Sequence, residues 1–164
     1  MDFTIRQPSA ADAPRIAELQ VATWRETYAH LLPEGFFDDA HIRGRHEMWN
    51  QILGEARDEL TVRIAERDGE LIGWAMVGPS FGAEDQDLPR DRQVYSIYVS
   101  RSQHGTGVGQ ALLDAALGAA PAVLWVAKEN PRAIAFYLRN GFAFDGVEQI
   151  DPLAPMITDA RMVR

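Results

Sequence analysis

Val94-Tyr95-Ser96-Ile97-Tyr98-Val99 is an apolar run that leads, through a short connection, into His104-Gly105-Thr106-Gly107-Val108-Gly109. The run predicts a β-strand, and the apolar residues after it predict a helix from Gly105 to about Leu117. Alternating glycines let the backbone turn tightly and come close to a ligand. Unpaired amides at a helix start, together with the helix dipole, favour an anion there. The segment therefore predicts a pyrophosphate site; a flexible turn that only caps a buried helix is the alternative.

Two common nucleotide-binding motifs do not fit this loop. The dinucleotide pattern G-x-G-x-x-G, begun at Gly105, requires glycine at the position where Gln110 stands. The Walker loop requires Gly-Lys followed by Ser or Thr, and no such run follows the glycines. A nucleotide-binding module without acyl chemistry therefore stays only as an alternative function.

Strand and helix patterns alternate along the rest of the chain. Strands are predicted at about 3–6, 60–65, 71–77, 94–99, 122–127, 142–147 and 155–163, and helices at about 10–28, 34–53 with a break near Gly44, 105–117 and 131–140. Asp68-Gly69 predicts a hairpin turn. The order β-α-α-β-β-β-α-β-α-β-β predicts an α/β fold with helices flanking a mixed, mostly antiparallel sheet. We expect one domain over residues 1–164.

The composition excludes several classes of protein. The chain has 164 residues, no cysteine and a formal net charge of −8. Without cysteine there is no disulfide and no thiolate nucleophile, and a cytoplasmic location is compatible with this. The sequence has no signal-peptide pattern and no run near the roughly 20 apolar residues of a membrane span. The acidity argues against nucleic-acid binding and favours an amine-bearing partner, although it also serves solubility.

The strand, the glycine loop and the following Gln110-Ala111-Leu112-Leu113 resemble the acetyl-CoA signature of the GCN5-related N-acetyltransferase (GNAT) superfamily. The usual form of that signature is Gln/Arg-x-x-Gly-x-Gly/Ala. When it is aligned on Gly107 and Gly109, its first position falls on His104, and Gln103 comes one place too early. This departure matters little if backbone amides hold the phosphates, but it leaves any side-chain contact at the first position open.

A second segment strengthens the resemblance. Residues 130–142 read Asn-Pro-Arg-Ala-Ile-Ala-Phe-Tyr-Leu-Arg-Asn-Gly-Phe and look like the family's N-x-x-A-x-x-F-Y-x-x-x-G-F segment. The matching positions are Asn130, Ala133, Phe136, Tyr137, Gly141 and Phe142. Both segments in this order imply the GNAT fold over nearly the whole chain, and an acyl-CoA-dependent N-acetyltransferase. Within the superfamily, residues 24–28 with Leu32-Pro33 resemble a bacterial branch that acetylates small molecules or polyamines.

The resemblance implies roles for the strand and the loop. The strand 94–99 is expected to diverge from the strand at 123–127, so that its free backbone edge binds the pantetheine amides. The Val99 amide would then polarise the thioester carbonyl. The residues expected to bind the cofactor here are Ile97, Tyr98, Val99, His104, Gly105, Thr106, Gly107, Val108, Gly109 and Gln110.

The second segment supplies the catalytic acid and further cofactor contacts. Tyr137 is expected to protonate the thiolate that leaves acetyl-CoA; the alternative is a half-buried tyrosine that packs on the sheet. Asn130 is expected to bind the pantetheine arm, to cap the helix before Pro131, or both. Arg139 reaches the 3′-phosphate of CoA or lies solvated at the helix end. Ala133 and Phe136 complete the expected cofactor contacts.

The acceptor side is less defined by the sequence. Trp24 and Tyr28 are expected to line the acceptor pocket, with core packing as the alternative for each. The acidic stretch 84–87 either attracts a cationic amine or is a solvated loop. The apolar and aromatic content is compatible with a homodimer, although no residue specifies one.

The general base is left open, because the strand 94–99 lacks the glutamate that many relatives place there. Tyr95 or Ser96 can relay the proton through water, and Glu26 and His30 are further candidates. The histidines make no convincing metal set, so no metal is expected.

The resulting hypothesis is direct attack of an amine, with a small molecule as acceptor, on acetyl-CoA in a ternary complex. A noncatalytic CoA-binding regulator with the same fold is the main alternative. The missing glutamate favours that alternative, and Tyr137 speaks against it.

Overall fold

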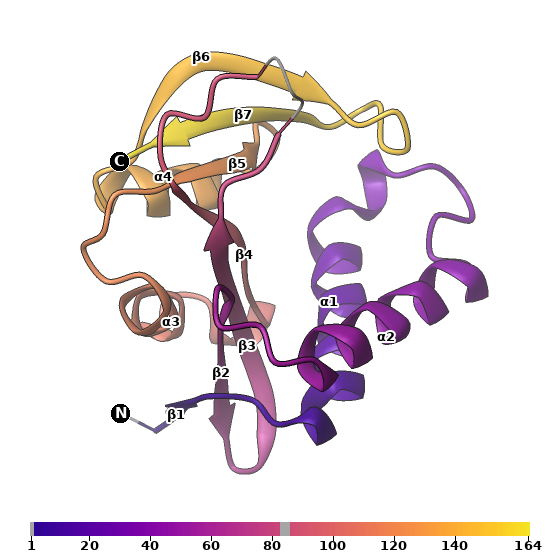
Figure 1. The fold of residues 1–164 in the computed structure, drawn as a ribbon. Coiled ribbons are helices and arrows are strands. Elements are labelled where there is room, and N and C mark those ends of the chain that lie inside the picture. The colour runs from indigo at the N-terminus through magenta and orange to yellow at the C-terminus, as the bar shows by residue number, and fades with distance from the viewer. Residues whose placement is uncertain (1, 83–85) are drawn as a thin grey trace.

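The computed structural model describes residues 2–82 and 86–164, and their helices and strands follow the predicted order (Figure 1). The strands are β1 Thr4–Arg6, β2 Thr61–Arg67, β3 Glu70–Pro79, β4 Arg92–Val99, β5 Val123–Ala127, β6 Ala143–Ile150 and β7 Thr158–Val163. The α-helices are α1 Ala13–Tyr28, α2 Asp39–Gly54, α3 Val108–Ala116 and α4 Pro131–Arg139. No helix in these ranges has the length and apolar character needed to cross a bilayer.

The strands of the described residues form one sheet of seven in the order β1-β2-β3-β4-β5-β7-β6. Neighbouring strands pair antiparallel except β4 and β5, which pair parallel, so the predicted mixed and mostly antiparallel α/β sheet is confirmed. The parallel pairing is limited to Gln93 with Val123 and Val94 with Leu124. Beyond Val94 the two strands separate, as Figure 1 shows, and the expected divergence is confirmed.

The predicted helix over 34–53 was wrong at its start and in its break. Residues 34–37 form a turn in which Gly35 has a φ of 77°, outside the helical region. The helix begins at Asp39, after the side chain of Asp38 accepts a hydrogen bond of 2.8 Å from the amide of His41. It then continues through Gly44 to Gly54. One glycine costs a helix interior only about 1 kcal/mol, and burial of Trp49 offsets that amount.

Two further boundaries also differ from the prediction. The helix expected from Gly105 begins at Val108, because Gly105 and Gly107 have φ values of 80° and 90°. The last strand begins at Thr158 rather than at Pro155, since the residues before it form turns. The remaining predicted boundaries agree to within a few residues, as expected for ends that fray.

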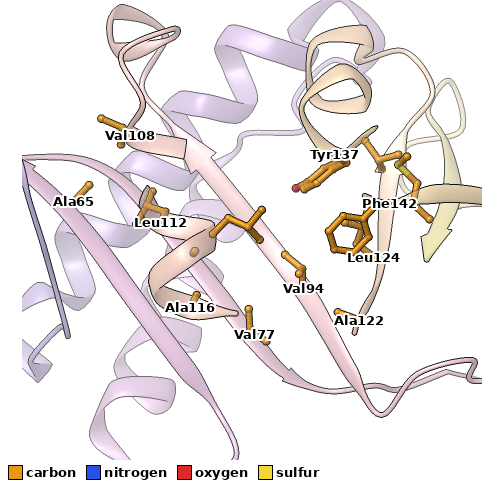
Figure 2. Close-up of a cluster of buried hydrophobic side chains, with 14 of the residues drawn as sticks. Ala65, Val77, Val94, Val108, Leu112, Ala116, Ala122, Leu124, Tyr137 and Phe142 are labelled. Atoms are coloured by element: carbon orange, nitrogen blue, oxygen red, sulfur yellow. The ribbon is translucent and has the colours of Figure 1, made fainter. Parts of the chain in front are cut away.

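The sheet separates two hydrophobic clusters. On one face α3 and α4 pack over β-strand residues such as Val94 and Leu124, and Figure 2 shows Leu112, Tyr137 and Phe142 in this cluster. On the other face α1 and α2 cover the sheet, and the fully buried Trp49 meets Trp74 edge to face at 4.7 Å. Both faces of β4 are therefore supported by helices, which holds its free edge in a defined position.

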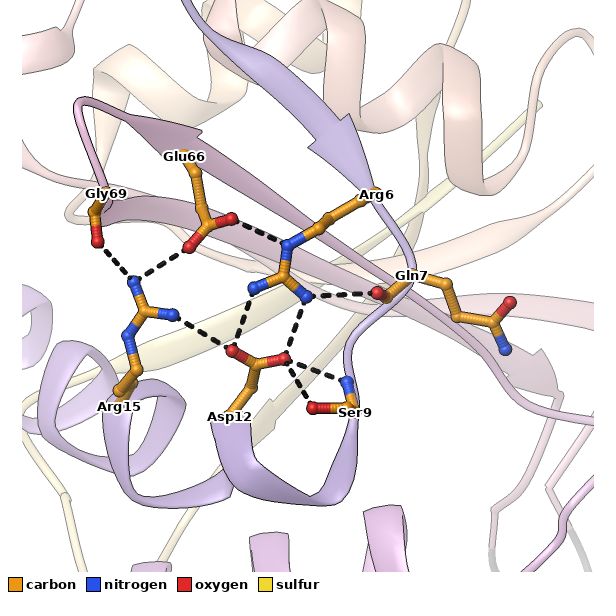
Figure 3. Close-up of polar contacts among 7 residues, drawn as sticks. All are labelled: Arg6, Gln7, Ser9, Asp12, Arg15, Glu66 and Gly69. Carbon is orange, nitrogen blue, oxygen red and sulfur yellow. Dashed lines mark hydrogen bonds and ion pairs between the residues drawn. The ribbon is translucent and has the colours of Figure 1, made fainter.

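A polar network ties β1 to the start of α1 and to β2 (Figure 3). Asp12 accepts from Arg6 at 2.8 and 2.9 Å, from Arg15 at 3.0 Å and from the amide of Ser9 at 2.8 Å. Both arginines also pair with Glu66 on β2. The Arg6 hydrogen bonds hold the pKa of Asp12 well below its ordinary range. Asp12 and Glu66 together therefore join three segments of the chain.

Candidate active site

A cavity of about 830 Å³ lies where β4 and β5 diverge. β4 and the glycine loop line it, opposite β5 and α4, and α1 and residues 151–159 line its far part. Most of the predicted site residues lie in this lining: Trp24, Tyr28, Ile97, Tyr98, Val99, His104, Gly105, Gly107, Gly109, Gln110, Asn130, Ala133, Phe136, Tyr137 and Arg139. Thr106 and Val108 are the exceptions. The Thr106 hydroxyl donates to the Gln103 carbonyl at 2.7 Å, and the Val108 side chain is buried in the core.

The backbone of β4 presents a free edge to the cavity. The amide of Ser100 donates to the carbonyl of Ile72 at 2.9 Å, which directs the Ser100 amide toward the β3 side. Amides of successive strand residues alternate in direction, so the Val99 amide points to the opposite side, where β5 has already separated. An edge of this kind can accept an extended ligand as an added strand.

Gly105 and Gly107 are needed in the loop for their backbone conformation and not because neighbouring atoms leave no room for a side chain. Gly105 and Gly107 have positive φ values, and a Cβ at either position would have no atom within 4 Å. Gly107 is the N-cap residue of α3, so the first amides of that helix lie next to open space. Gly109 is closer to its surroundings, since a Cβ there would meet Phe136 at 3.7 Å. The loop thus has the features of an anion site at a helix N-terminus.

His104, the residue that departs from the usual signature, contacts the end of β4. Its Nε2 atom lies 3.1 Å from the carbonyl oxygen of Val99. Burial and the neighbouring Arg132 lower the pKa of His104. Because a carbonyl oxygen only accepts, Nε2 must carry a proton, which assigns the tautomer of the neutral ring.

The hydroxyl of Tyr137 is the polar end of an otherwise buried side chain. Tyr137 is 7% exposed, and its ring packs against Phe136 and Phe142. Figure 2 shows Tyr137 beside Phe142. Among the described residues its hydroxyl has no hydrogen-bond partner, although Tyr137 lines the cavity. Burial raises the pKa of Tyr137 well above its ordinary value, so the phenol keeps its proton at neutral pH. Tyr137 thus packs on its aromatic neighbours and also lines the cavity.

Aromatic side chains from α1 form another part of the cavity wall. The indole nitrogen of Trp24 donates to the hydroxyl of Tyr98 at 2.8 Å, and Trp24 stacks on Phe36. Asn130 caps α4 by accepting from the Ala133 amide at 3.1 Å, and its amide group donates to the Tyr28 hydroxyl at 3.1 Å. The capping role of Asn130 is thus confirmed, and both the oxygen and the nitrogen of its side-chain amide are hydrogen bonded within the protein.

The structure separates the candidates for the general base. Glu26 and His30 are exposed and lie outside the cavity lining. Tyr95 lines the cavity, but its hydroxyl donates to the carbonyl of Pro79. Ser96 also lines the cavity, which leaves it as the candidate on β4 that still faces the site.

Sequence reasoning missed two carboxylates of the cavity wall. Asp159 on β7 and Asp151 before it lie in the lining, and no motif or spacing in the sequence connects them to the glycine loop. The acidic stretch at 84–87 falls partly outside the described residues, which omit 83–85. Within the described part of the chain, His, Asp and Glu side chains form no group of three that could hold a metal ion.

Comparison with known proteins connects this architecture to a family. The model of the acetyltransferase (GNAT) family matches residues 15–142. A probable N-acetyltransferase of Mycobacterium tuberculosis is 28% identical over 151 residues, covering 88% of this chain and 82% of that protein. A mycothiol acetyltransferase of Cellulomonas flavigena is 31% identical over 140 residues, covering 76% of this chain but only 38% of that protein.

Solved structures share the fold. The PaiA N-acetyltransferase of Thermoplasma acidophilum, determined in complex with coenzyme A, superposes with a TM-score of 0.72 at 19% identity, covering 98% of each chain. The family model spans both segments that carry the glycine loop and Tyr137. The chain therefore belongs to the acetyltransferase (GNAT) family and is an acyl-CoA-dependent N-acetyltransferase.

Proposed function

We propose that the cavity between β4 and β5 binds acetyl-CoA and that an amine attacks the acetyl group directly, in a ternary complex. The unpartnered hydroxyl of the buried Tyr137, facing a cavity whose other wall is the free edge of β4, is the observation that carries this proposal. A cavity that joins a proton donor, a free strand edge and an anion-binding loop suits a ligand with a thioester, amides and phosphates.

The residues present fit the parts of acetyl-CoA in order. The amides at the start of α3 and the backbone of the glycine loop, from Gly105 to Gly109, hold the pyrophosphate. The free edge of β4 from Ile97 to Val99 binds the pantetheine amides. Arg132 and Arg139 line the same part of the cavity and supply positive charge for the remaining phosphate.

The reaction needs a polarised carbonyl and a protonated leaving group. Acetyl-CoA supplies the thioester, whose carbonyl carbon the amine attacks. The Val99 amide donates to the carbonyl oxygen, on which negative charge develops. The attacking nitrogen loses a proton to water, while Tyr137 donates its own proton to the departing thiolate and then regains one from water. The raised pKa of Tyr137 keeps the phenol protonated at neutral pH. Because the Val99 contact is a backbone contact, a change of the Val99 side chain to alanine should have little effect.

The proposed transfer proceeds without an acyl-enzyme, and the chain has no cysteine that could form a thioester intermediate.

A small molecule is the acceptor that we favour. The Cellulomonas relative, which is named a mycothiol acetyltransferase, supports a small acceptor. The aromatic wall formed by Trp24 and Tyr28 suits the packing of a small amine rather than of an extended polypeptide.

A thiol-release assay with acetyl-CoA and a panel of primary amines tests the proposal, with lysine-containing peptides included. We expect CoA release that depends on a small amine, together with formation of the acetylated product. Tight binding of acetyl-CoA without turnover for any amine would instead favour the noncatalytic regulator, and turnover only with peptides would overturn the small-molecule acceptor.

A further inference from the structure

The attacking nitrogen needs a base, and β4 does not supply one. At neutral pH an aliphatic amine is an ammonium, which has to lose a proton before it can attack a thioester. On β4 the hydroxyl of Tyr95 donates to the carbonyl of Pro79, and the hydroxyl of Ser96 can relay a proton but does not retain one. A side-chain base therefore has to come from another part of the cavity wall.

Among the described residues of that wall, three side chains can accept a proton at neutral pH: His104, Asp151 and Asp159. His104 belongs to the glycine loop, and its Nε2 atom contacts the carbonyl of Val99. Asp151 is exposed to solvent, whereas Asp159 is half-buried. Asp159 is thus the one of the three that lies away from both the phosphate end of the cavity and the bulk solvent.

The pairing of β7 with β5 decides where Asp159 lies. It is opposite Ala127, the last residue of β5, beyond the point at which β4 and β5 separate. Directly opposed residues of neighbouring strands place their side chains on the same face of a sheet. Ala127 packs with Tyr28 of α1 in one buried cluster. Asp159 therefore lies on the α1 side of the sheet, in the part of the cavity away from the glycine loop.

Tyrosine side chains connect Asp159 to the proposed acid. Burial raises the pKa values of Tyr28 and Tyr98, and the charge of Asp159 adds to both effects, so the carboxylate lies near these two phenols. Burial, followed by Tyr28, also raises the pKa of Tyr137. Tyr28 therefore interacts with both the carboxylate of Asp159 and the phenol of Tyr137. The reaction needs a proton acceptor and a proton donor in one cavity, and these side chains place both there.

No cation of the described residues neutralises Asp159. Arg161, two positions further along β7, pairs with Asp145 at 2.7 Å. Lys128, which follows β5, pairs with Glu148 at 2.8 Å. The carboxylate of Asp159 is therefore free to accept a proton from a ligand.

The surroundings also make Asp159 a stronger base than an ordinary aspartate. Burial, followed by the charges of Asp151 and Glu129, raises its pKa. A general base works best when its pKa lies near the working pH, and the shift of Asp159 is in that direction. The titratable and charged groups around it are Tyr28 on α1, Tyr98 on β4, Lys128 and Glu129 after β5, Tyr137 on α4, Asp151 before β7 and Arg161 on β7.

We propose that Asp159 is the general base, which takes a proton from the ammonium form of the acceptor. This inference rests on the proposed transfer to a small amine. The lone pair that is freed forms the bond from nitrogen to the carbonyl carbon, and the nitrogen then loses its second proton to water. The C–S bond breaks as Tyr137 protonates the sulfur, and Asp159 returns its proton to solvent.

Two amines of nearly the same shape test the inference. At neutral pH ethylamine is an ammonium, whereas trifluoroethylamine is mostly a free amine, because fluorine withdraws electron density from the nitrogen. Asp159→Asn should lower kcat for ethylamine about 100-fold. It should hardly change kcat for trifluoroethylamine or the Kd of acetyl-CoA. Because burial of the Asp159 charge is unfavourable, the variant should melt at the wild-type temperature or above it, which excludes unfolding as the cause.

The pH dependence of kcat for ethylamine is the second measurement. In the wild type kcat should fall as the pH falls and Asp159 becomes protonated, at a pH above the ordinary aspartate pKa of about 4. In Asp159→Asn kcat should instead rise with pH throughout, since only free ethylamine then reacts. Asp151→Asn removes a charge that raises the pKa of Asp159, so it should move the wild-type fall to lower pH without abolishing it.

The possible failures are distinguishable. A higher KM for ethylamine with unchanged kcat in Asp159→Asn would show that Asp159 only attracts the ammonium, and this overturns the inference alone. Equal losses of kcat for the two amines, or a wild-type pH profile that Asp159→Asn retains, would also overturn the inference and leave the proposed function standing. Absence of CoA release by the wild type with every amine of the panel would overturn the proposed function, and the inference with it.

Discussion

The Nε2 atom of His104 lies 3.1 Å from the carbonyl oxygen of Val99 and joins the glycine loop to the end of β4. The amide and the carbonyl of one strand residue point to the same side, so His104 engages Val99 on the side that faces the cavity. The contact holds Val99 in place, and the amide of Val99 is the group that we propose polarises the thioester carbonyl. The position that departs from the usual signature therefore supports the strand end with a side chain of different chemistry.

Replacing His104 tests that support. His104→Ala removes one hydrogen bond, worth about 1 kcal/mol, and should lower kcat/KM for acetyl-CoA about fivefold. His104→Gln introduces the residue that the family signature commonly has and keeps an N–H donor, so it should retain most of the wild-type value. Steady-state kinetics with acetyl-CoA as the varied substrate check this. Equal losses in both variants would contradict a donor role for His104.

Tyr137→Phe tests the general acid. The ring, and therefore its packing on Phe136 and Phe142, is kept, while the proton is lost. We expect kcat to fall about 100-fold and the Kd of acetyl-CoA to stay the same. Because burial raises the pKa of Tyr137, the wild-type rate should show no loss from its ionisation below about pH 10. Unchanged turnover in the variant would remove Tyr137 from the mechanism.

Substitutions of two glycines of positive φ, one at each end of α3, distinguish an effect on ligand binding from an effect on stability. Gly107 has a φ of 90° before the helix, and Gly118 has a φ of 63° after it. An alanine at either position should cost about 1–2 kcal/mol of unfolding free energy. Gly107→Ala should in addition weaken acetyl-CoA binding, because it distorts the amides at the helix start, whereas Gly118→Ala should not. Denaturant unfolding and calorimetry measure the two effects, and equal affinities would contradict the anion-site assignment.

The network around Asp12 predicts a pH dependence of stability. Hydrogen bonds from Arg6 are the main cause that lowers the folded-state pKa of Asp12. The ionised carboxylate therefore stabilises the fold at pH values above its unfolded pKa of about 4, and this stabilisation is lost as the pH falls below that value. Asp12→Asn should cost about 1–2 kcal/mol at neutral pH, since the side chains of Arg6 and Arg15 are 37% and 34% exposed and screened.

The difference between Asp12→Asn and the wild type should shrink when unfolding is measured at about pH 3. A difference that does not change with pH would show that the charge of Asp12 contributes nothing. Catalysis at neutral pH should be unaffected at temperatures well below the melting point, because Asp12 lies outside the cavity lining.

Local signals in the sequence were sufficient for several parts of the site. The φ values of Gly105 and Gly107, and the cap that Asn130 forms before Pro131, depend on residues within one turn of each other. The failed break at Gly44 shows the limit of such signals, because packing of the buried Trp49 outweighs one unfavourable residue.

The sequence by itself determined the element order and singled out the glycine loop and Tyr137 as candidates, because each depends on short-range backbone preferences or on a family motif. Only the tertiary structure decided that His104 reaches Val99, that β4 and β5 separate after Val94, and that Asp159 lies in the same cavity as Tyr137. Strand register and helix packing create these contacts, and residues that they join from distant segments carry no local pattern that reveals the pairing.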